Sequence, residues 1–300
     1  MFDFEEVPWS IETLNARLRL LQPDEVLRIE DLPNEIYHGV IGVSCSKLKV
    51  LINDCAFMYK ATFIDKLVPF EHKSYFDFGS AGHTMILEPH KFDSEYCKMP
   101  DYSGEGSQAK RDRFKVLAEK RGQTVLSEAH YNAMPKLRAA IDANPRAKAF
   151  TSGGVAEVSY FKRDEETGLI IKARPDYVIG NVIVDLKTSD TVNPKFLPGK
   201  FSKLGYDIQD AMYCDVVGAD AFVFVAIQSA APYMVTAPIM FDGTKRKIAR
   251  IKYRAGLKEL KRCMDSGEWP AYQPNEKGAF VLKANKFEIN ELEKLESENE

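Results

Sequence analysis

The stretch Arg174-Pro-Asp-Tyr-Val-Ile-Gly-Asn-Val-Ile-Val-Asp-Leu-Lys187 decides the fold that this sequence predicts. Its two apolar halves flank Gly180-Asn181, a dipeptide that suits the two-residue loop of a β-hairpin. The half that follows the loop is apolar on both faces at first, as expected of a central strand. We therefore predict two paired strands, at residues 169–179 and 182–187.

Three charged side chains mark one face of this hairpin. Asp185 and Lys187 are two residues apart on a strand, so both side chains leave the same face, whereas Leu186 points into the core. Asp176 comes nine residues before Asp185, on the strand that pairs with it. Two carboxylates and an ammonium at the end of an apolar strand are costly to bury unless they serve one another or a bound ion.

This grouping of charges predicts a metal site. Two carboxylates held close together repel, and a divalent cation relieves the repulsion. Hard oxygen ligands favour Mg²⁺, with Mn²⁺ as a substitute. Such an ion polarises a phosphodiester and activates water, and a neighbouring lysine offsets charge on the reacting phosphate. Glu157, on the preceding strand, is a further candidate carboxylate; its alternative role is an ion pair with Arg174 or Lys172.

The flanking sequence predicts helices around further strands. The fold class is α/β with α+β character: a mixed central sheet flanked by helices. Ser44 or Ser46 would be the N-cap of the first helix. The predicted helices are 44–66, 75–88, 111–121, 127–143, 204–217 and 244–265, and the other strands are 155–161, 220–228 and 233–240. We expect an irregular N-terminal arm (1–40), one domain (41–280) and an acidic tail (281–300).

Composition limits the class of protein. The chain is 45% apolar and 28% charged, and no apolar run of about 18 residues exists to span a bilayer. The first eight residues lack the features of a signal peptide. The five cysteines are scattered without a CxxC pair, which indicates free thiols and argues against an iron–sulfur or zinc cluster. We therefore expect a cytoplasmic protein. The net charge of −3 does not by itself indicate a nucleic-acid binder, although the segments 195–203 and 245–262 are basic.

Several motifs resemble those of one nuclease superfamily. Pro175-Asp176 with Asp185-Leu186-Lys187 resembles the PD-(D/E)xK motif and implies a restriction-endonuclease-like core. Phe78-Gly79-Ser80-Ala81-Gly82-His83, followed by Ile86-Leu87-Glu88-Pro89, is similar to the GxxxH helix of the RecB-like branch, and Gln209 to Tyr213 is similar to its QxxxY helix. The strongest resemblance is to the nuclease domain of RecE-type enzymes, exodeoxyribonuclease VIII, over roughly residues 30–275. It includes the stretches 32–39, 44–49 and 268–272.

This resemblance implies roles for individual residues. Asp176 and Asp185 would be metal ligands, with His83 a ligand or its neighbour, and Leu186 would contribute its backbone carbonyl. Lys187 would be the catalytic lysine. Gln209 and Tyr213 would line the site and touch the DNA backbone, and Arg174 is a candidate phosphate contact. The alternatives stay open: His83 as a core histidine, Gln209 and Tyr213 as helix-packing residues, and Arg174 as a solvated charge.

The resemblance also implies an activity. It is metal-dependent degradation of one strand of linear double-stranded DNA from the 5′ end, in phage-type or prophage-type recombination. Related enzymes form homo-oligomeric rings around the duplex and act with a RecT-type single-strand annealing protein. Three alternatives are an endonuclease on the same scaffold, a catalytically inactive DNA-binding protein, and a metal hydrolase acting on another phosphate ester.

Overall fold

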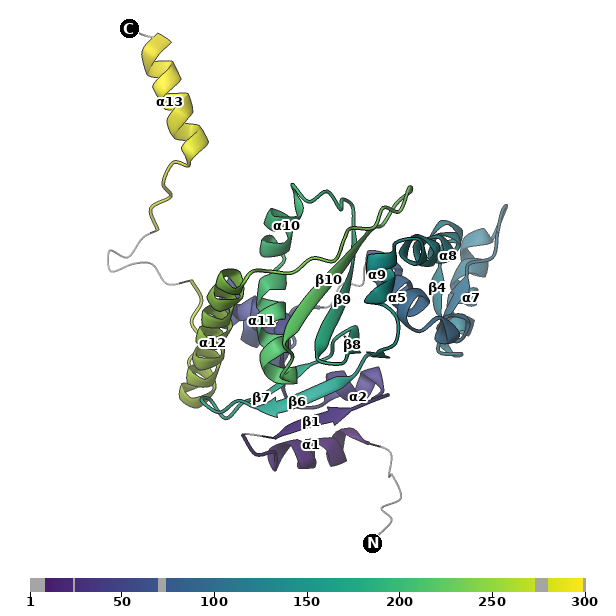
Figure 1. Cartoon of the computed structure of the whole chain (residues 1–300), viewed down its shortest axis with the longest axis horizontal. Helices are drawn as coiled ribbons and strands as arrows, with labels where there is room; N and C mark the ends of the chain where they lie inside the picture. The colour runs from purple at the N-terminus through teal and green to yellow at the C-terminus, as the bar shows by residue number, and fades with distance from the viewer. Residues whose placement is uncertain (1–8, 24, 70–73, 273–279, 299–300) are drawn as a thin grey trace.

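The computed structural model describes residues 9–23, 25–69, 74–272 and 280–298. Two four-stranded sheets form its centre (Figure 1). The first has the order β10-β9-β8-β5 and the second the order β1-β6-β7-β2. Each sheet combines one parallel pair with two antiparallel pairs, which confirms the predicted mixed α/β architecture. The strands of the first sheet are β10 (Ala221–Gln228), β9 (Val182–Ser189), β8 (Tyr177–Ile179) and β5 (Val155–Ala156). Those of the second are β1 (Val26–Ile29), β6 (Ser159–Arg163), β7 (Ile170–Ala173) and β2 (Val43–Ser44).

The predicted hairpin is confirmed. β8 pairs with β9 in antiparallel register, with Ile179 opposite Val182, and Gly180 adopts the positive φ of 55° that a tight loop requires. On its other side β9 pairs in parallel with β10 over eight residues. β9 is therefore a central strand, as its apolar composition predicts.

Two predicted strands are each broken in two. The segment 155–161 leaves the first sheet after Ala156 and enters the second at Ser159, and the segment 169–179 crosses between Ala173 and Tyr177. Pro175 has no N–H for a strand ladder, and Glu157 has a φ of +51°, outside the β region. The expectation of continuous strands is wrong at these bends, and both bends carry an acidic candidate residue.

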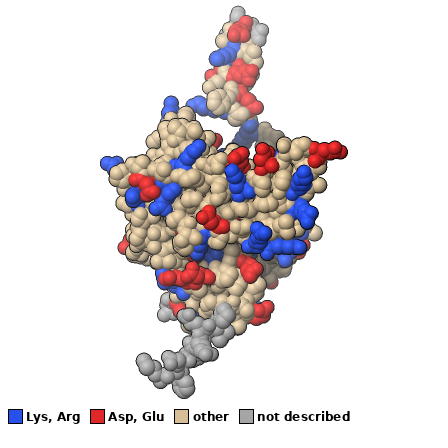
Figure 2. Space-filling model, turned by 90° about the vertical axis from the view of Figure 1, so that its right-hand side faces the viewer, with Lys and Arg blue, Asp and Glu red and all other residues tan. Residues whose placement is uncertain are grey.

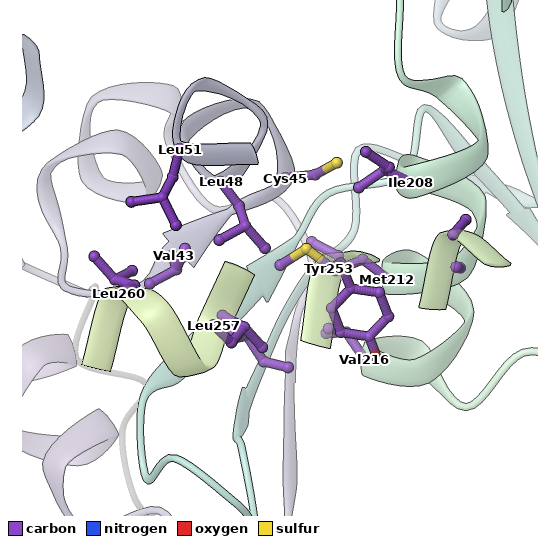
Figure 3. Close-up of a cluster of buried hydrophobic side chains, with 14 of the residues drawn as sticks. Val43, Cys45, Leu48, Leu51, Ile208, Met212, Val216, Tyr253, Leu257 and Leu260 are labelled. Carbon is purple, nitrogen blue, oxygen red and sulfur yellow. The ribbon is translucent and has the colours of Figure 1, made fainter. Parts of the chain in front are cut away.

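Three helices cover one face of the second sheet and form a common core (Figure 3). They are α3 (Cys45–Asn53), α11 (Tyr206–Val217) and α12 (Gly243–Ser266). Leu48, Met212 and Leu257 meet at its centre. The Ser44 hydroxyl accepts from the Lys47 N–H at 3.5 Å, so Ser44 is the N-cap. The predicted helix 44–66 is interrupted after Asn53, and α4 (Ala56–Tyr59) and a π-helical turn (Lys60–Ile64) follow.

Helices α5 (Ser74–Leu87) and α8 (Glu128–Asp142) pack against the first sheet. Phe78 and Ala81 of α5 and Leu137 of α8 share a core with Val184 and Leu186 of β9. Nearby lie smaller elements: a 3-10 turn (Pro89–Lys91), α6 (Phe92–Glu95), β3 (Tyr96–Lys98), α7 (Ser107–Glu119), β4 (Thr124–Leu126) and α9 (Pro145–Ala149). This packing fixes α5 beside the central hairpin.

The expectation of an irregular N-terminal arm is wrong for residues 9–40. They form α1 (Ile11–Arg19), β1 and α2 (Asn34–Gly39), and β1 is the edge strand of the second sheet. Leu14, Leu18 and Tyr37 share a core with Phe161 of β6. Arg163 of β6 donates to the carbonyls of Arg19 and Leu21, at 2.7 and 2.6 Å. These partners are distant in sequence, so local patterning does not reveal the packing.

The C-terminal part also departs from expectation at one strand. Residues 233–240 form isolated bridges to β10 instead of a regular strand, in a segment interrupted by Pro238. α10 (Leu197–Lys203) lies near this segment, and α13 (Lys286–Glu298) forms the acidic tail. All five cysteines are free, as predicted. Among the described residues, no helix combines the length and apolarity that crossing a membrane requires.

Candidate active site

The two bends and the central strand bring the predicted residues together. Asp185 and Lys187 lie on β9, Asp176 precedes β8, and Glu157 lies between β5 and β6. His83 approaches from α5 and Gln209 from α11. The site therefore lies where both sheets meet, with one helix on each side.

Asp185 and Lys187 form an ion pair at the centre of the site. The Asp185 side chain is 1% exposed. Gln209 Nε2 donates to Asp185 Oδ1 at 2.6 Å, and Lys187 Nζ donates to Gln209 Oε1 at 3.4 Å. Asp185 Oδ2 is buried and accepts no hydrogen bond besides its ion pair with Lys187. The three side chains thus hold one another, with Gln209 as the bridge between the acid and the base.

Asp176 connects β9 to α5. Its Oδ2 accepts the Leu186 N–H at 2.7 Å and lies 3.4 Å from His83 Nδ1. The Glu157 N–H donates to the Asp176 carbonyl at 3.2 Å. Leu186 therefore contacts this carboxylate through its N–H, and the predicted role of its carbonyl as a metal ligand stays a prediction.

The acidic residues of the site raise one another's pKa values. Burial, and after it the nearby Asp176 carboxylate, raise the pKa of Glu157 to about 8. Burial, together with Asp176, raises the pKa of Asp185 to about 6. Burial alone would lower the pKa of Lys187, but the Asp185 and Asp176 carboxylates outweigh it and the net shift is upward. Such strained carboxylates beside a stabilised ammonium are typical of functional sites.

Tyr206 contacts the candidate site and was not predicted from the sequence. Lys187 Nζ lies over its ring, 4.4 Å from the centroid. Tyr206 begins α11 and precedes Gln209 by three residues, so both lie on the same face of the helix. That spacing is the signal that could have identified it.

Arg174 and Lys172 anchor the N-terminal segment to the site. Arg174 donates to Ser159 Oγ at 2.9 Å and to the Leu32 carbonyl at 2.9 Å, and its guanidinium lies 4.0 Å from the Tyr37 ring centroid. Lys172 is buried and donates to the carbonyl of Tyr37 at 2.6 Å. Arg174 is thus engaged by protein groups, and its role as a phosphate contact stays a prediction.

Tyr213 lies among apolar side chains. It is partly buried between two apolar cores, and burial raises the pKa of its hydroxyl well above the ordinary value. It lines neither the cavity beside Glu157 nor the larger cavity near α10. Packing is therefore its observed environment, and contact with the DNA backbone remains a prediction.

A cavity of about 440 Å³ opens beside the carboxylates. His83, Glu157 and Arg174 line it, together with Ser80, Thr84, Glu88 and Glu95 and with residues 31–34 of the N-terminal segment. A larger cavity, of about 1080 Å³, lies between residues 191–201 and 234–245 and contains none of the predicted site residues. The smaller cavity therefore reaches His83, Glu157 and Arg174, whereas Asp176, Asp185 and Lys187 are not among its lining residues.

The donor set matches a hard divalent cation in composition. Asp176, Asp185 and Glu157 supply oxygen atoms and His83 supplies a nitrogen, and the buried Asp185 Oδ2 has no hydrogen-bond partner besides its ion pair with Lys187. The Asp185 carboxylate contacts Lys187 and Gln209, and the Asp176 carboxylate contacts His83 and the Leu186 N–H. Among the described residues no three acidic, histidine or cysteine side chains already converge as a metal-binding group.

The fold and this clustering of acids with a lysine define a protein of the PD-(D/E)xK nuclease superfamily. The chain belongs to the family described as a PDDEXK-like domain of unknown function (DUF3799), which matches residues 44–279. No protein with a curated description matches the chain. The superfamily predicted from the motifs is thereby confirmed, and membership of the RecE type stays a prediction.

One of the similar solved structures shares the fold of this chain. A candidate exonuclease from Eubacterium rectale is 19% identical, with a TM-score of 0.54, and the alignment covers 84% of this chain and 92% of that one. An alkaline exonuclease from Laribacter hongkongensis is 14% identical, with a TM-score of 0.30 and coverage of 62% and 89%. A phage-related exonuclease from Haemophilus somnus is 16% identical, with a TM-score of 0.30 and coverage of 76% and 97%. At 19% identity, the likeness to the Eubacterium rectale protein concerns the fold alone.

Proposed function

We propose that this protein is a metal-dependent deoxyribonuclease that degrades linear double-stranded DNA from its ends. One observation carries the proposal: Asp176, Asp185 and Lys187 converge at the bend between the two sheets, with Glu157 and His83 beside them. Superfamily membership supports a divalent metal ion, for which we propose Mg²⁺.

The proposed roles follow from the contacts of each residue. Asp176, Asp185 and Glu157 would hold the metal, with His83 as a further ligand or as the partner that orients Asp176. The bound ion would supply positive charge to the scissile phosphate and acidify a water molecule. Lys187, kept protonated by its carboxylate neighbours, would place its ammonium against a phosphate oxygen. Gln209 would orient Lys187 and Asp185 relative to each other.

The polarity and the biological setting rest on the RecE-type resemblance of the motifs. It supports digestion from the 5′ end, a homo-oligomeric ring and a RecT-type annealing partner in phage-type recombination. The exonuclease named among the structural relatives agrees with end-dependence. Acidic and basic side chains are interspersed on the face in Figure 2, so a ring that encircles the duplex would explain retention of DNA better than the charge of this face.

The test uses purified full-length protein, Mg²⁺, end-labelled linear duplex DNA and a covalently closed circle of the same sequence. Asp185→Ala and Lys187→Ala are the inactivating variants, and EDTA is added in a parallel reaction. Asp190→Ala is the matched control, because Asp190 follows the same strand but is 80% exposed and pairs with Lys200. Loss of the linear substrate alone is expected, with at least a 100-fold lower rate in both inactivating variants and a normal rate in the control.

Each alternative has its own outcome. Cutting of the circle would establish an endonuclease in place of an exonuclease. Release of the 3′ label first would reverse the polarity. Binding of DNA without cleavage, in Mg²⁺ and in Mn²⁺, would indicate a DNA-binding protein that is not an enzyme. Full activity of Asp185→Ala would show that the proposed active site is wrong.

A further inference from the structure

The basic helix α12 places three arginines on one face, at a spacing of four residues. The first two bind carboxylates of α11, the helix that carries Gln209, and the third binds a carboxylate that follows β6. The ion pairs are Arg246 with Asp210, Arg250 with Asp215, and Arg254 with Asp164. Two of these arginines therefore join α12 directly to α11.

Of the two pairs between α11 and α12, the one beside Gln209 is the more deeply buried. The Asp210 side chain is 0% exposed and that of Arg246 is 19% exposed, with 2.8 Å between Asp210 Oδ1 and Arg246 Nε. The corresponding fractions in the other pair are 28% for Asp215 and 42% for Arg250. Asp210 follows Gln209 directly in the sequence, whereas Asp215 lies about one and a half turns further along α11.

Net stability does not explain a buried pair at this place. Removing two charges from water costs about as much as their attraction returns, and Asp210 Oδ2 accepts no hydrogen bond from the described residues. Apolar side chains already hold the two helices together, since Met212 and Val216 of α11 share a core with Leu257 of α12 (Figure 3). What the ion pair adds is direction, because it forms at only one rotation and register of the helices.

We propose that Asp210 and Arg246 are positioning residues that set the rotation of α11 and thereby hold Gln209 between Asp185 and Lys187. Gln209 Nε2 donates to Asp185 Oδ1 at 2.6 Å, and Gln209 Oε1 accepts from Lys187 Nζ at 3.4 Å. A rotation of α11 would lengthen at least one of these two contacts. This role rests on the proposed function, because it concerns the geometry of the same active site.

The test separates positioning from folding by an apolar double variant, Asp210→Leu with Arg246→Met. Arg246→Met alone leaves the Asp210 carboxylate buried without its cation, so it should lower both stability and kcat. The apolar double variant removes both charges at similar total volume, and its midpoint of urea unfolding should return close to the wild-type value. Apolar groups restore no direction, so its kcat on linear duplex DNA should stay roughly 10-fold below wild type, with little change in KM. Recovery of kcat together with stability would overturn the proposal.

Arg250→Met is the matched control. It breaks the other ion pair between the same two helices, and Asp215 keeps the hydrogen bond that it accepts from Tyr253. We expect this variant to be less stable than wild type but to retain the wild-type kcat. A loss of kcat equal to that of Arg246→Met would count against a special role of the buried pair, because any loosening of α11 would then be sufficient.

A double-mutant cycle determines whether the effect on kcat passes through Gln209. Gln209→Ala should lower kcat by itself, and combining it with the apolar double variant should lower kcat no further. A second loss of full size would show that Asp210 and Arg246 act by another route.

The side-chain amide of Gln209 gives a readout that needs no catalysis. Its NMR signal in protein with isotope-labelled glutamine is the one that Gln209→Ala lacks. We expect this signal to move toward that of a solvent-exposed amide in the apolar double variant and to stay in place in Arg250→Met. An unmoved signal in the apolar double variant would overturn the proposal. If the wild type cuts no DNA in Mg²⁺ or Mn²⁺, the proposed function fails, and this signal still decides whether the pair holds Gln209.

Discussion

The Glu157 N–H donates to the carbonyl oxygen of Asp176 at 3.2 Å, at the point where both segments cross from one sheet to the other. This backbone contact fixes two acidic residues of separate strands next to each other. Their carboxylates then share one partly buried site, and the pKa of Glu157 rises as a result. The bend is therefore the feature that assembles the candidate metal ligands.

Replacement of Lys187 by methionine should destabilise the protein strongly. The carboxylate of Asp185, 1% exposed, would lose the cation that compensates its charge. Breaking a buried pair in this way costs about 3–5 kcal/mol of the free energy of unfolding. Urea unfolding at pH 8, above the pKa of Asp185, measures the change. Adding Asp185→Asn to Lys187→Met should recover part of the loss, since no charge then remains buried; equal midpoints for wild type and Lys187→Met would contradict the argument.

The stability of the metal-free protein should fall as pH rises from about 5 to 8. The folded-state pKa of Glu157, about 8, lies above its ordinary value of 4.5, so between these values the folded chain holds a proton that the unfolded chain has released. Its contribution is complete below pH 4.5 and is lost as pH rises through 8. Glu157→Gln should flatten this slope, as measured by urea unfolding in EDTA at several pH values. An identical slope in both proteins would show that Glu157 does not titrate as described.

We expect the ring of Tyr206, and not its hydroxyl, to support the activity. The ring lies under the Lys187 ammonium, and a cation–π contact contributes about 0.5–2 kcal/mol. Tyr206→Leu should therefore lower kcat roughly 3- to 30-fold with a smaller change in KM, whereas Tyr206→Phe should retain most of the activity. A Tyr206→Phe variant as impaired as Tyr206→Leu would place the effect in the hydroxyl.

Mg²⁺ should stabilise the folded protein independently of any DNA. An ion that binds only the folded state adds about 2.7 kcal/mol at 100 times its Kd. The melting temperature should therefore rise with Mg²⁺ in the wild type and in Asp190→Ala, and should stay constant in Asp176→Ala and Asp185→Ala. A shift in the two inactive variants equal to that of the wild type would place the ion elsewhere.

Much of the fold could be predicted because the relevant signals are local. Helices α5, α8 and α12 follow from apolar periodicity and caps, such as the Ser127 side chain that accepts from the His130 N–H at 3.2 Å. The strand 233–240 and the continuous strands through Glu157 and Asp176 were wrong predictions, since alternation alone does not say where a chain leaves a sheet. The irregular character of residues 9–40 was also a wrong prediction, whereas the domain boundaries at residues 40 and 280 stay a prediction.

The site was predicted in part for the same reason. Asp185, Lys187 and Asp176 share one hairpin, so their proximity could be predicted from the strand pattern. The motif resemblance implied that the helices of Gln209 and His83 flank this hairpin, and in the structure Gln209 contacts Asp185 and His83 contacts Asp176. Tyr206 was missed because its importance lies in a contact with Lys187 across 19 residues of sequence. The packing of residues 9–40, and their place in the wall of the site cavity, depend on partners more than 100 residues away.

The sequence by itself determined the hairpin and the face that Asp185 and Lys187 share, because a strand repeats every two residues and Gly180-Asn181 closes the loop locally. Only the tertiary structure decided the bends at Glu157 and Asp176. It also decided the burial that raises the pKa of Asp185 and the position of the Tyr206 ring beneath the Lys187 ammonium. Burial and long-range contacts depend on segments that meet only when the chain is packed. The pKa values, and with them the chemistry of the site, therefore belong to the folded molecule.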